Sequence, residues 1–102
     1  MMIDVDITTV ARNWSTELSH SGECSAVGLR HNPSYSDQMP PGWSGVAENV
    51  GCDRSVEMIH QAFMNSSGHR ENILNETYNR VGVGVSTTSD GTLWVIQNFG
   101  RY

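Results

Sequence analysis

Residues 80–99, RVGVGVSTTSDGTLWVIQNF, decide the fold of this chain. The first eight of them alternate valine with small residues, which is the period of two of a β-strand. Residues 89–91, Ser-Asp-Gly, supply a turn signal, and residues 92–99 then form the returning strand of a β-hairpin. Because Gly82 and Gly84 leave one face of the first strand without side chains, we expect a helix or a ligand to approach its backbone there.

The returning strand carries apolar side chains on both of its faces. One face presents Leu93, Val95, Gln97 and Phe99, and the other presents Trp94, Ile96 and Asn98. A strand of this kind must be covered on both sides. We therefore predict the α+β class, as a three-layer α-β-α sandwich in which helices enclose a small antiparallel sheet.

Three helices and one extended segment are predicted before the hairpin. The first helix carries an apolar stripe with the spacing of one helical face, made of Ile7, Val10, Ala11, Trp14 and Leu18. Asp4 or Asp6 is its expected N-cap, and Gly22 lies just past its expected end. A second helix is predicted over residues 55–66 with Ser55 as N-cap, and a short third one over residues 69–74. Residues 45–52 are expected to be extended.

Residues 21–45 form a long irregular stretch, punctuated by glycine and proline. Ordered loops of this length in a compact domain usually carry function. This one contains His31 together with the aromatic residues Tyr35 and Trp43. We therefore expect an ordered and functional segment.

Length and charge narrow the function classes. The chain has 102 residues, which predicts a single domain over residues 1–102. Its formal net charge is −5, and it lacks the clustered basic residues that phosphate binding needs, so a nucleic-acid-binding role is excluded. No apolar run approaches the ~18 residues of a membrane helix. The opening Met-Met-Ile-Asp has neither the basic nor the apolar region of a signal peptide, so none is predicted in this chain.

The two cysteines, Cys24 and Cys52, leave two readings open. They form either one disulfide, as in oxidising compartments, or two buried thiols. Their number rules out a multi-cysteine zinc site. In the chain-entropy model a bridge closing this loop stabilises the fold by about 3–4 kcal/mol.

Three residues from different elements are candidates for a shared site: His31, Glu48 and His69. Two imidazoles and one carboxylate that leave a fourth position to water make a zinc-type arrangement. The other two histidines have simpler readings: His20 lies near a helix end, where a cation suits the dipole, and His60 lies at the border of an apolar stripe. Spacing alone does not show that the three candidates meet.

Several segments, in this order, resemble the CAP superfamily. This group comprises the cysteine-rich secretory, venom-antigen and plant pathogenesis-related proteins with their bacterial SCP-domain relatives. The resemblance covers nearly the whole chain and rests on residues 31–33 (HNP), 47–50 (AENV), 63–74 (FMNSSGHRENIL), 78–85 (YNRVGVGV) and 94–100 (WVIQNFG). The segment 63–74 is similar to the bacterial form of the family's histidine motif.

The resemblance implies an α-β-α sandwich with a cleft lined by two histidines and two acidic residues. His31, Glu48 and His69 match three of these positions. The second acidic position is Ser66 here, and Glu71, on the next helical segment, is the candidate to substitute for it. Through His31 and His69 the resemblance implies a divalent metal such as zinc, and Glu48 with His69 are the candidates for acid–base catalysis.

The resemblance also implies that one helix is missing. The start of this chain resembles the start of the family's second helix, so we expect an N-terminally truncated domain. The alternative is a natural minimal form, a homodimer whose interface covers the apolar surface that the missing helix leaves.

Two functions are carried forward. The first is a secreted, extracellular, non-catalytic binding domain whose His/Glu cleft takes a divalent metal, a small apolar or lipid ligand, or an extracellular protein. The alternative is a hydrolase that acts on extracellular peptide or glycan through a metal or through the Glu48/His69 pair. A third reading is a cleft whose polar groups only satisfy one another.

Overall fold

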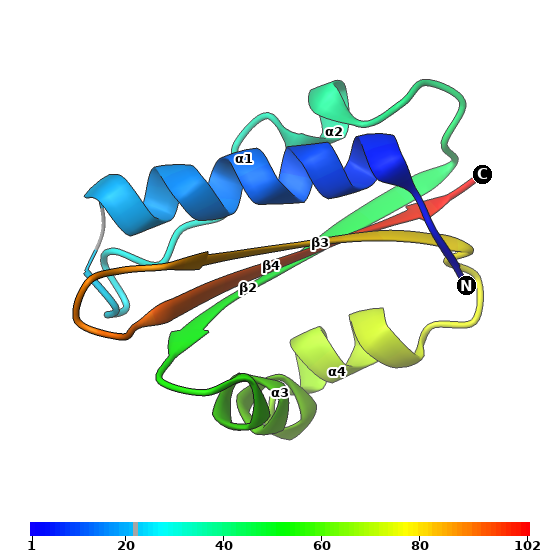
Figure 1. Cartoon of the computed structure of the whole chain (residues 1–102). Helices are drawn as coiled ribbons and strands as arrows, with labels where there is room; N and C mark the ends of the chain where they lie inside the picture. The colour runs from blue at the N-terminus through cyan, green and yellow to red at the C-terminus, as the bar shows by residue number, and fades with distance from the viewer. Residues whose placement is uncertain (22) are drawn as a thin grey trace.

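The computed structural model describes residues 1–21 and 23–102, and Gly22, the residue expected just past the first helix, lies outside them. The elements, in chain order, are β1 (Met2–Ile3), α1 (Val5–Ser21), α2 (Tyr35–Gln38), β2 (Gly45–Asp53), α3 (Val56–Asn65), α4 (Ser67–Leu74), β3 (Arg80–Thr87) and β4 (Leu93–Arg101). The four strands form one sheet in the order β1-β3-β4-β2. Figure 1 shows α1 on one face of this sheet and α3 with α4 on the other. The predicted three-layer sandwich is confirmed.

The hairpin is the centre of the sheet. β3 pairs antiparallel with β4 from Arg80↔Gly100 to Thr87↔Leu93, and β4 pairs antiparallel with β2 on its other side. β1, which was not predicted, adds two residues in parallel to the outer edge of β3. Apolar side chains fill both sides of the sheet, as the two-faced return strand predicts. One cluster comprises Ala11, Leu18, Val50, Trp94 and Ile96, and the other comprises Ile59, Phe63 and Val95.

Gly82 and Gly84 of β3 allow the backbone of α1 to lie directly against the strand. A Cβ on Gly82 would overlap the backbone of α1 at Ile7 and Thr8, and a Cβ on Gly84 would overlap it at Ala11. The close approach expected at this face is therefore made by α1. Its N-terminus is capped by Asp4, whose Oδ1 accepts from the backbone N–H groups of Asp6 and Ile7.

The two helices on the opposite face meet at one residue. Ser55 caps α3 as predicted, because its Oγ accepts from the N–H of Met58. Ser66 is both the C-cap of α3 and the N-cap of α4, with extended backbone. α4 begins at Ser67, two residues before the predicted start, so the pair Ser67-Gly68 lies inside the helix.

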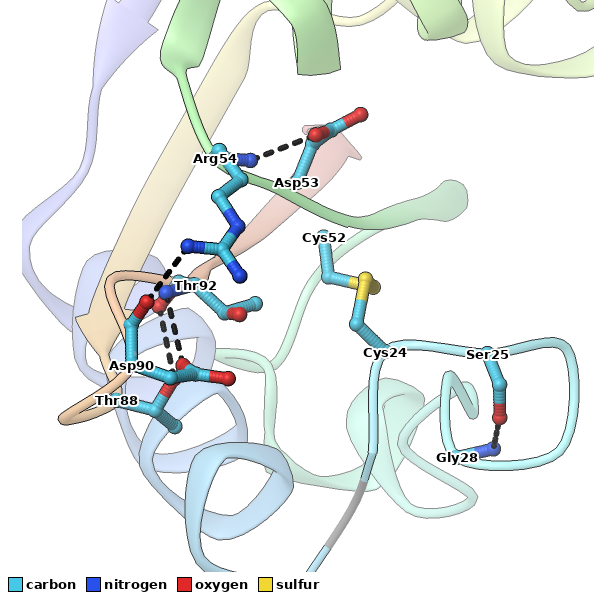
Figure 2. The surroundings of a disulfide bond; sticks show 9 residues. All are labelled: Cys24, Ser25, Gly28, Cys52, Asp53, Arg54, Thr88, Asp90 and Thr92. Atoms are coloured by element: carbon cyan, nitrogen blue, oxygen red, sulfur yellow. Dashed lines mark hydrogen bonds between the residues drawn. A yellow bond between two sulfur atoms is a disulfide. The ribbon is translucent and has the colours of Figure 1, made fainter.

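Cys24 and Cys52 form a disulfide, with their Cα atoms 5.8 Å apart, which settles the two readings in favour of the bridge. Figure 2 shows the bridge at the end of β2, near the turn between β3 and β4, where an Arg54 side-chain N–H donates to the carbonyl oxygen of Asp90. The bridge ties the segment that leads to His31 onto β2. Among the described residues, no helix combines the length and apolar character needed to cross a bilayer.

Candidate functional site

Glu48 is the fixed point of the site. It lies in β2 opposite Asn98 of β4, and its side chain is only 1% exposed. Oε1 accepts from the backbone N–H of Asn32 at 2.9 Å and lies 2.9 Å from His31 Nδ1, while Oε2 accepts from Asn98 Nδ2 at 3.0 Å. Both oxygens of this buried carboxylate are thus held by the protein, which offsets the cost of burying it.

The imidazole of His31 is hydrogen-bonded at Nδ1, and its Nε2 is left for a ligand. Its side chain is 60% exposed although it contacts a buried carboxylate. Because Glu48 accepts at this oxygen, Nδ1 carries the proton of the hydrogen bond, and Nε2 of the neutral ring keeps its lone pair. The neighbouring Asn32 donates from its side chain to Gln38 Oε1, so α2 supports the loop that carries His31.

His69 lies in α4 and is positioned from several directions. Its Nδ1 is 2.8 Å from Ser66 Oγ, and its ring stacks on Phe63 with centroids 5.0 Å apart. Its carbonyl oxygen accepts from Asn49 Nδ2 of β2. Burial lowers the pKa of His69 below its usual 6.5, and the charge of His31 lowers it further. The ring is therefore neutral at neutral pH.

The structure brings all the predicted cleft residues to one pocket of about 450 Å³. Its lining comprises His31, Glu48, Asn49, Ser66, Gly68, His69, Glu71 and Asn72. Glu71 is exposed on α4, in the short helix that also carries His69. The two carboxylates and two imidazoles thus share a single opening.

Amide side chains that the sequence pattern did not predict join these elements. Asn72 Nδ2 donates to Asn49 Oδ1, and Asn49 Nδ2 donates to Gln97 Oε1 of β4. These bonds tie α4 to the sheet beneath the pocket. The only signal in the sequence was position, since Asn49 follows Glu48 and Asn72 follows Glu71.

The arrangement fits a cation with two protein ligands better than a closed metal centre. In the part of the chain that the structure describes, no group of three or more His, Cys, Asp or Glu side chains is placed to hold a metal ion. Glu48 is committed to His31, Asn32 and Asn98. The atoms that suit a cation are therefore Nε2 of His31 and Nε2 of His69.

One family model matches nearly the whole chain, and one curated protein resembles part of it. The sequence model named "CAP: Cysteine-rich secretory protein family" matches residues 1–99. The uncharacterized protein YkwD of Bacillus subtilis (strain 168) is 40% identical over 55 residues, which make up 53% of this chain and 21% of that protein. This chain thus aligns with about a fifth of the length of that relative.

Solved structures share the fold. An outer surface protein of Borrelia burgdorferi superposes with a TM-score of 0.80 at 18% identity, over 99% of this chain and 77% of the other. An extracellular protein containing a SCP domain, from Bacillus anthracis, gives 0.70 at 26% identity, over 100% of this chain and 34% of the other. Venom allergen-like protein 4 of Schistosoma mansoni gives 0.68 at 6% identity, over 97% and 66%.

These matches confirm the predicted family and its α-β-α sandwich. The chain belongs to the CAP family, the cysteine-rich secretory protein family.

Proposed function

We propose that this chain is an extracellular, non-catalytic binding domain that holds a cation, such as zinc, between His31 and His69. The observation that carries the proposal is that Nδ1 of each ring is held by another side chain, Glu48 at 2.9 Å and Ser66 at 2.8 Å. Nε2 of each ring is thereby left for a ligand, as in histidines that bind metals. Imidazole nitrogens suit zinc, and water would complete the coordination of a site with two protein ligands.

Two observations support an extracellular location. The disulfide between Cys24 and Cys52 is typical of oxidising compartments. Two of the proteins that share the fold are described as an outer surface protein and an extracellular protein, and the latter is 26% identical.

The state of Glu48 supports a binding role over a catalytic one. A general base needs a lone pair within reach of the proton that it removes. Glu48 is buried, and both of its oxygens accept hydrogen bonds from the protein. Its contribution is to orient His31 and to hold the proton on Nδ1.

The experiment that tests the proposal is calorimetric titration of the domain with zinc. We expect measurable heat in the wild type, a loss of at least about tenfold in affinity for His31→Ala and for His69→Ala, and no change for the exposed His60→Ala. Equal affinity in the wild type and in both site variants would contradict a site at these rings. No heat at high micromolar zinc would contradict zinc as the cation.

A hydrolase acting on extracellular peptide or glycan is the second candidate. The observation that favours it is the 2.8 Å distance between Ser66 Oγ and His69 Nδ1, at which a serine and its base can exchange a proton. A fluorophosphonate probe should then label the wild type and leave Ser66→Ala unlabelled. An unlabelled wild type at excess probe would remove Ser66 as a nucleophile.

A further inference from the structure

The histidine pocket is the pocket of about 450 Å³ that His31 and His69 line. A second, smaller cavity adjoins it. It has a volume of about 170 Å³ and lies between β2 and α3, where its lining includes Leu29, Val50, Ile59 and Phe63. Ser66 and His69 line both this cavity and the histidine pocket. A ligand that reaches His69 therefore lies next to an apolar cavity.

The size of this cavity limits what it accepts. An apolar cavity of about 150 Å³ admits benzene. The present cavity is close to that size, so a single ring or a short branched chain fills it, whereas a sterol or a long acyl chain exceeds it. The small apolar ligand that the family resemblance implies thus fits inside this cavity, whereas only part of a large lipid does.

The charge of the histidine pocket favours a positive group. Its lining contains two carboxylates, Glu48 and Glu71, and no lysine or arginine among the described residues. When the His31 ring carries one proton, that proton is on Nδ1 and is donated to Glu48, so Nε2 has a lone pair. An ammonium group offers only N–H donors, which matches these acceptors, whereas an anion would face two negative charges.

We propose that the ligand is a small organic ammonium ion with a benzene-sized apolar group, its charged end in the histidine pocket and its apolar end in the cavity beside His69. The inference rests on the proposed binding of a cation between His31 and His69 and names the class of that cation. Zinc and the ammonium group use the same nitrogens, so they compete.

Three probes separate charge from shape: benzylammonium, benzoate and methylammonium. Each is titrated into the domain while backbone amide shifts are followed by NMR. We expect benzylammonium to bind at least about tenfold more tightly than methylammonium, because it also buries a ring. It should also bind more tightly than benzoate, which has the same ring and the opposite charge. Equal binding of benzoate, or of methylammonium, would overturn the proposal.

A matched pair of variants tests the apolar cavity. Ala62 lines the cavity from an exposed position on α3, so Ala62→Leu narrows the cavity without disturbing the core. We expect this variant to reduce benzylammonium affinity to about the methylammonium level and to leave zinc affinity unchanged. Gln61→Leu, at the neighbouring exposed position outside the cavity, is the control and should bind as the wild type does. Unchanged benzylammonium affinity in Ala62→Leu would overturn the proposal.

The two levels of proposal fail in different ways. Zinc binding that depends on both histidines, without benzylammonium binding, overturns the inference and keeps the proposed function. Binding of neither cation overturns both. Benzylammonium binding that His31→Ala and His69→Ala abolish supports both, even if zinc gives no heat.

Discussion

The imidazole Nδ1 of His31 lies 2.9 Å from Oε1 of Glu48, and this contact joins a largely exposed ring to a buried carboxylate. The two residues are 17 positions apart, one in a loop and one in β2. The contact therefore connects an exposed ring of the pocket with the interior of the sheet. The orientation of His31 depends on a charge that solvent does not reach.

Replacement of Glu48 by glutamine tests this connection. One carboxylate oxygen becomes an NH₂ group, which can only donate. In one orientation of the amide it faces the NH₂ group of Asn98, and in the other it faces the N–H groups of Asn32 and His31. Leaving a buried donor unsatisfied costs about 1–3 kcal/mol, so we expect Glu48→Gln to lower the free energy of unfolding by that amount. Urea denaturation measures it, with Glu71→Gln as control at an exposed position, expected to stay within about 0.5 kcal/mol of the wild type. An unchanged unfolding midpoint in Glu48→Gln would refute the argument.

The lowered pKa of His69 predicts that stability depends on pH. Histidine in the unfolded chain titrates near 6.5, and burial places the pKa of His69 below that value in the folded state. Between the two values the unfolded state binds more protons, so stability rises with pH. The neutral ring of His69 therefore contributes fully to stability above pH 6.5. This contribution is lost as the pH falls from 6.5 through the pKa of the folded state.

The measurement is the urea midpoint at about pH 7.5 and about pH 5.5, on either side of the unfolded pKa. The wild type should be less stable at the lower pH, and His69→Gln should show a smaller difference between the two. His60→Gln, at an exposed histidine, should keep the wild-type difference. If His69→Gln also keeps it, His69 is not the group responsible.

Much of the fold was predictable because the signals are local. The valine alternation of β3, the apolar stripe of α1 and the Ser55 cap all lie within single segments. Two elements were not predictable for the opposite reason. α2 is a polar helix of four residues without a buried face, and β1 is a two-residue strand that depends on its parallel pairing with β3.

The site was predictable in its residue types and not in its contacts. The family resemblance pointed to His31, Glu48, Ser66, His69 and Glu71, which the structure places around one pocket. Which nitrogen of each ring is held, and the role of Asn49 and Asn72, depend on side-chain directions that spacing does not encode. Amide side chains neither titrate nor prefer zinc, so position next to Glu48 and Glu71 is the only signal that the sequence carries for them.

Reduction of the disulfide should destabilise the whole domain. The bridge spans a sequence separation of 28, for which the chain-entropy model gives about 3–4 kcal/mol. We expect the free energy of unfolding to fall by up to this amount when dithiothreitol is added to the wild type. The Cys24→Ser/Cys52→Ser double variant should start at the lower value and not respond. A wild type that is equally stable with and without reductant would contradict a stabilising bridge.

The homodimer that the sequence left as the alternative to a truncated domain stays a prediction, and the exposed side of β3 allows a test of it. Val83 and Val85 are 40% and 50% exposed, and they alternate with the glycines that face α1. If a second copy covers this face, sedimentation velocity should show dimers that Val83→Thr/Val85→Thr dissociates. Val27→Thr, in a loop at 82% exposure, should leave the dimers intact. A wild type that sediments as a monomer at about 100 μM, a concentration at which a micromolar dimer would form, would contradict the dimer.

Ser66 ends one helix, begins the next and lines both cavities. The relative orientation of α3 and α4 therefore depends on the backbone torsions at Ser66, their shared cap. Glu48 lies in β2 and His31 in the preceding loop, so their contact lies outside both helices. Because His69 and Glu71 lie on α4, a substitution that reorients α4 at Ser66 moves these two side chains relative to the contact between Glu48 and His31.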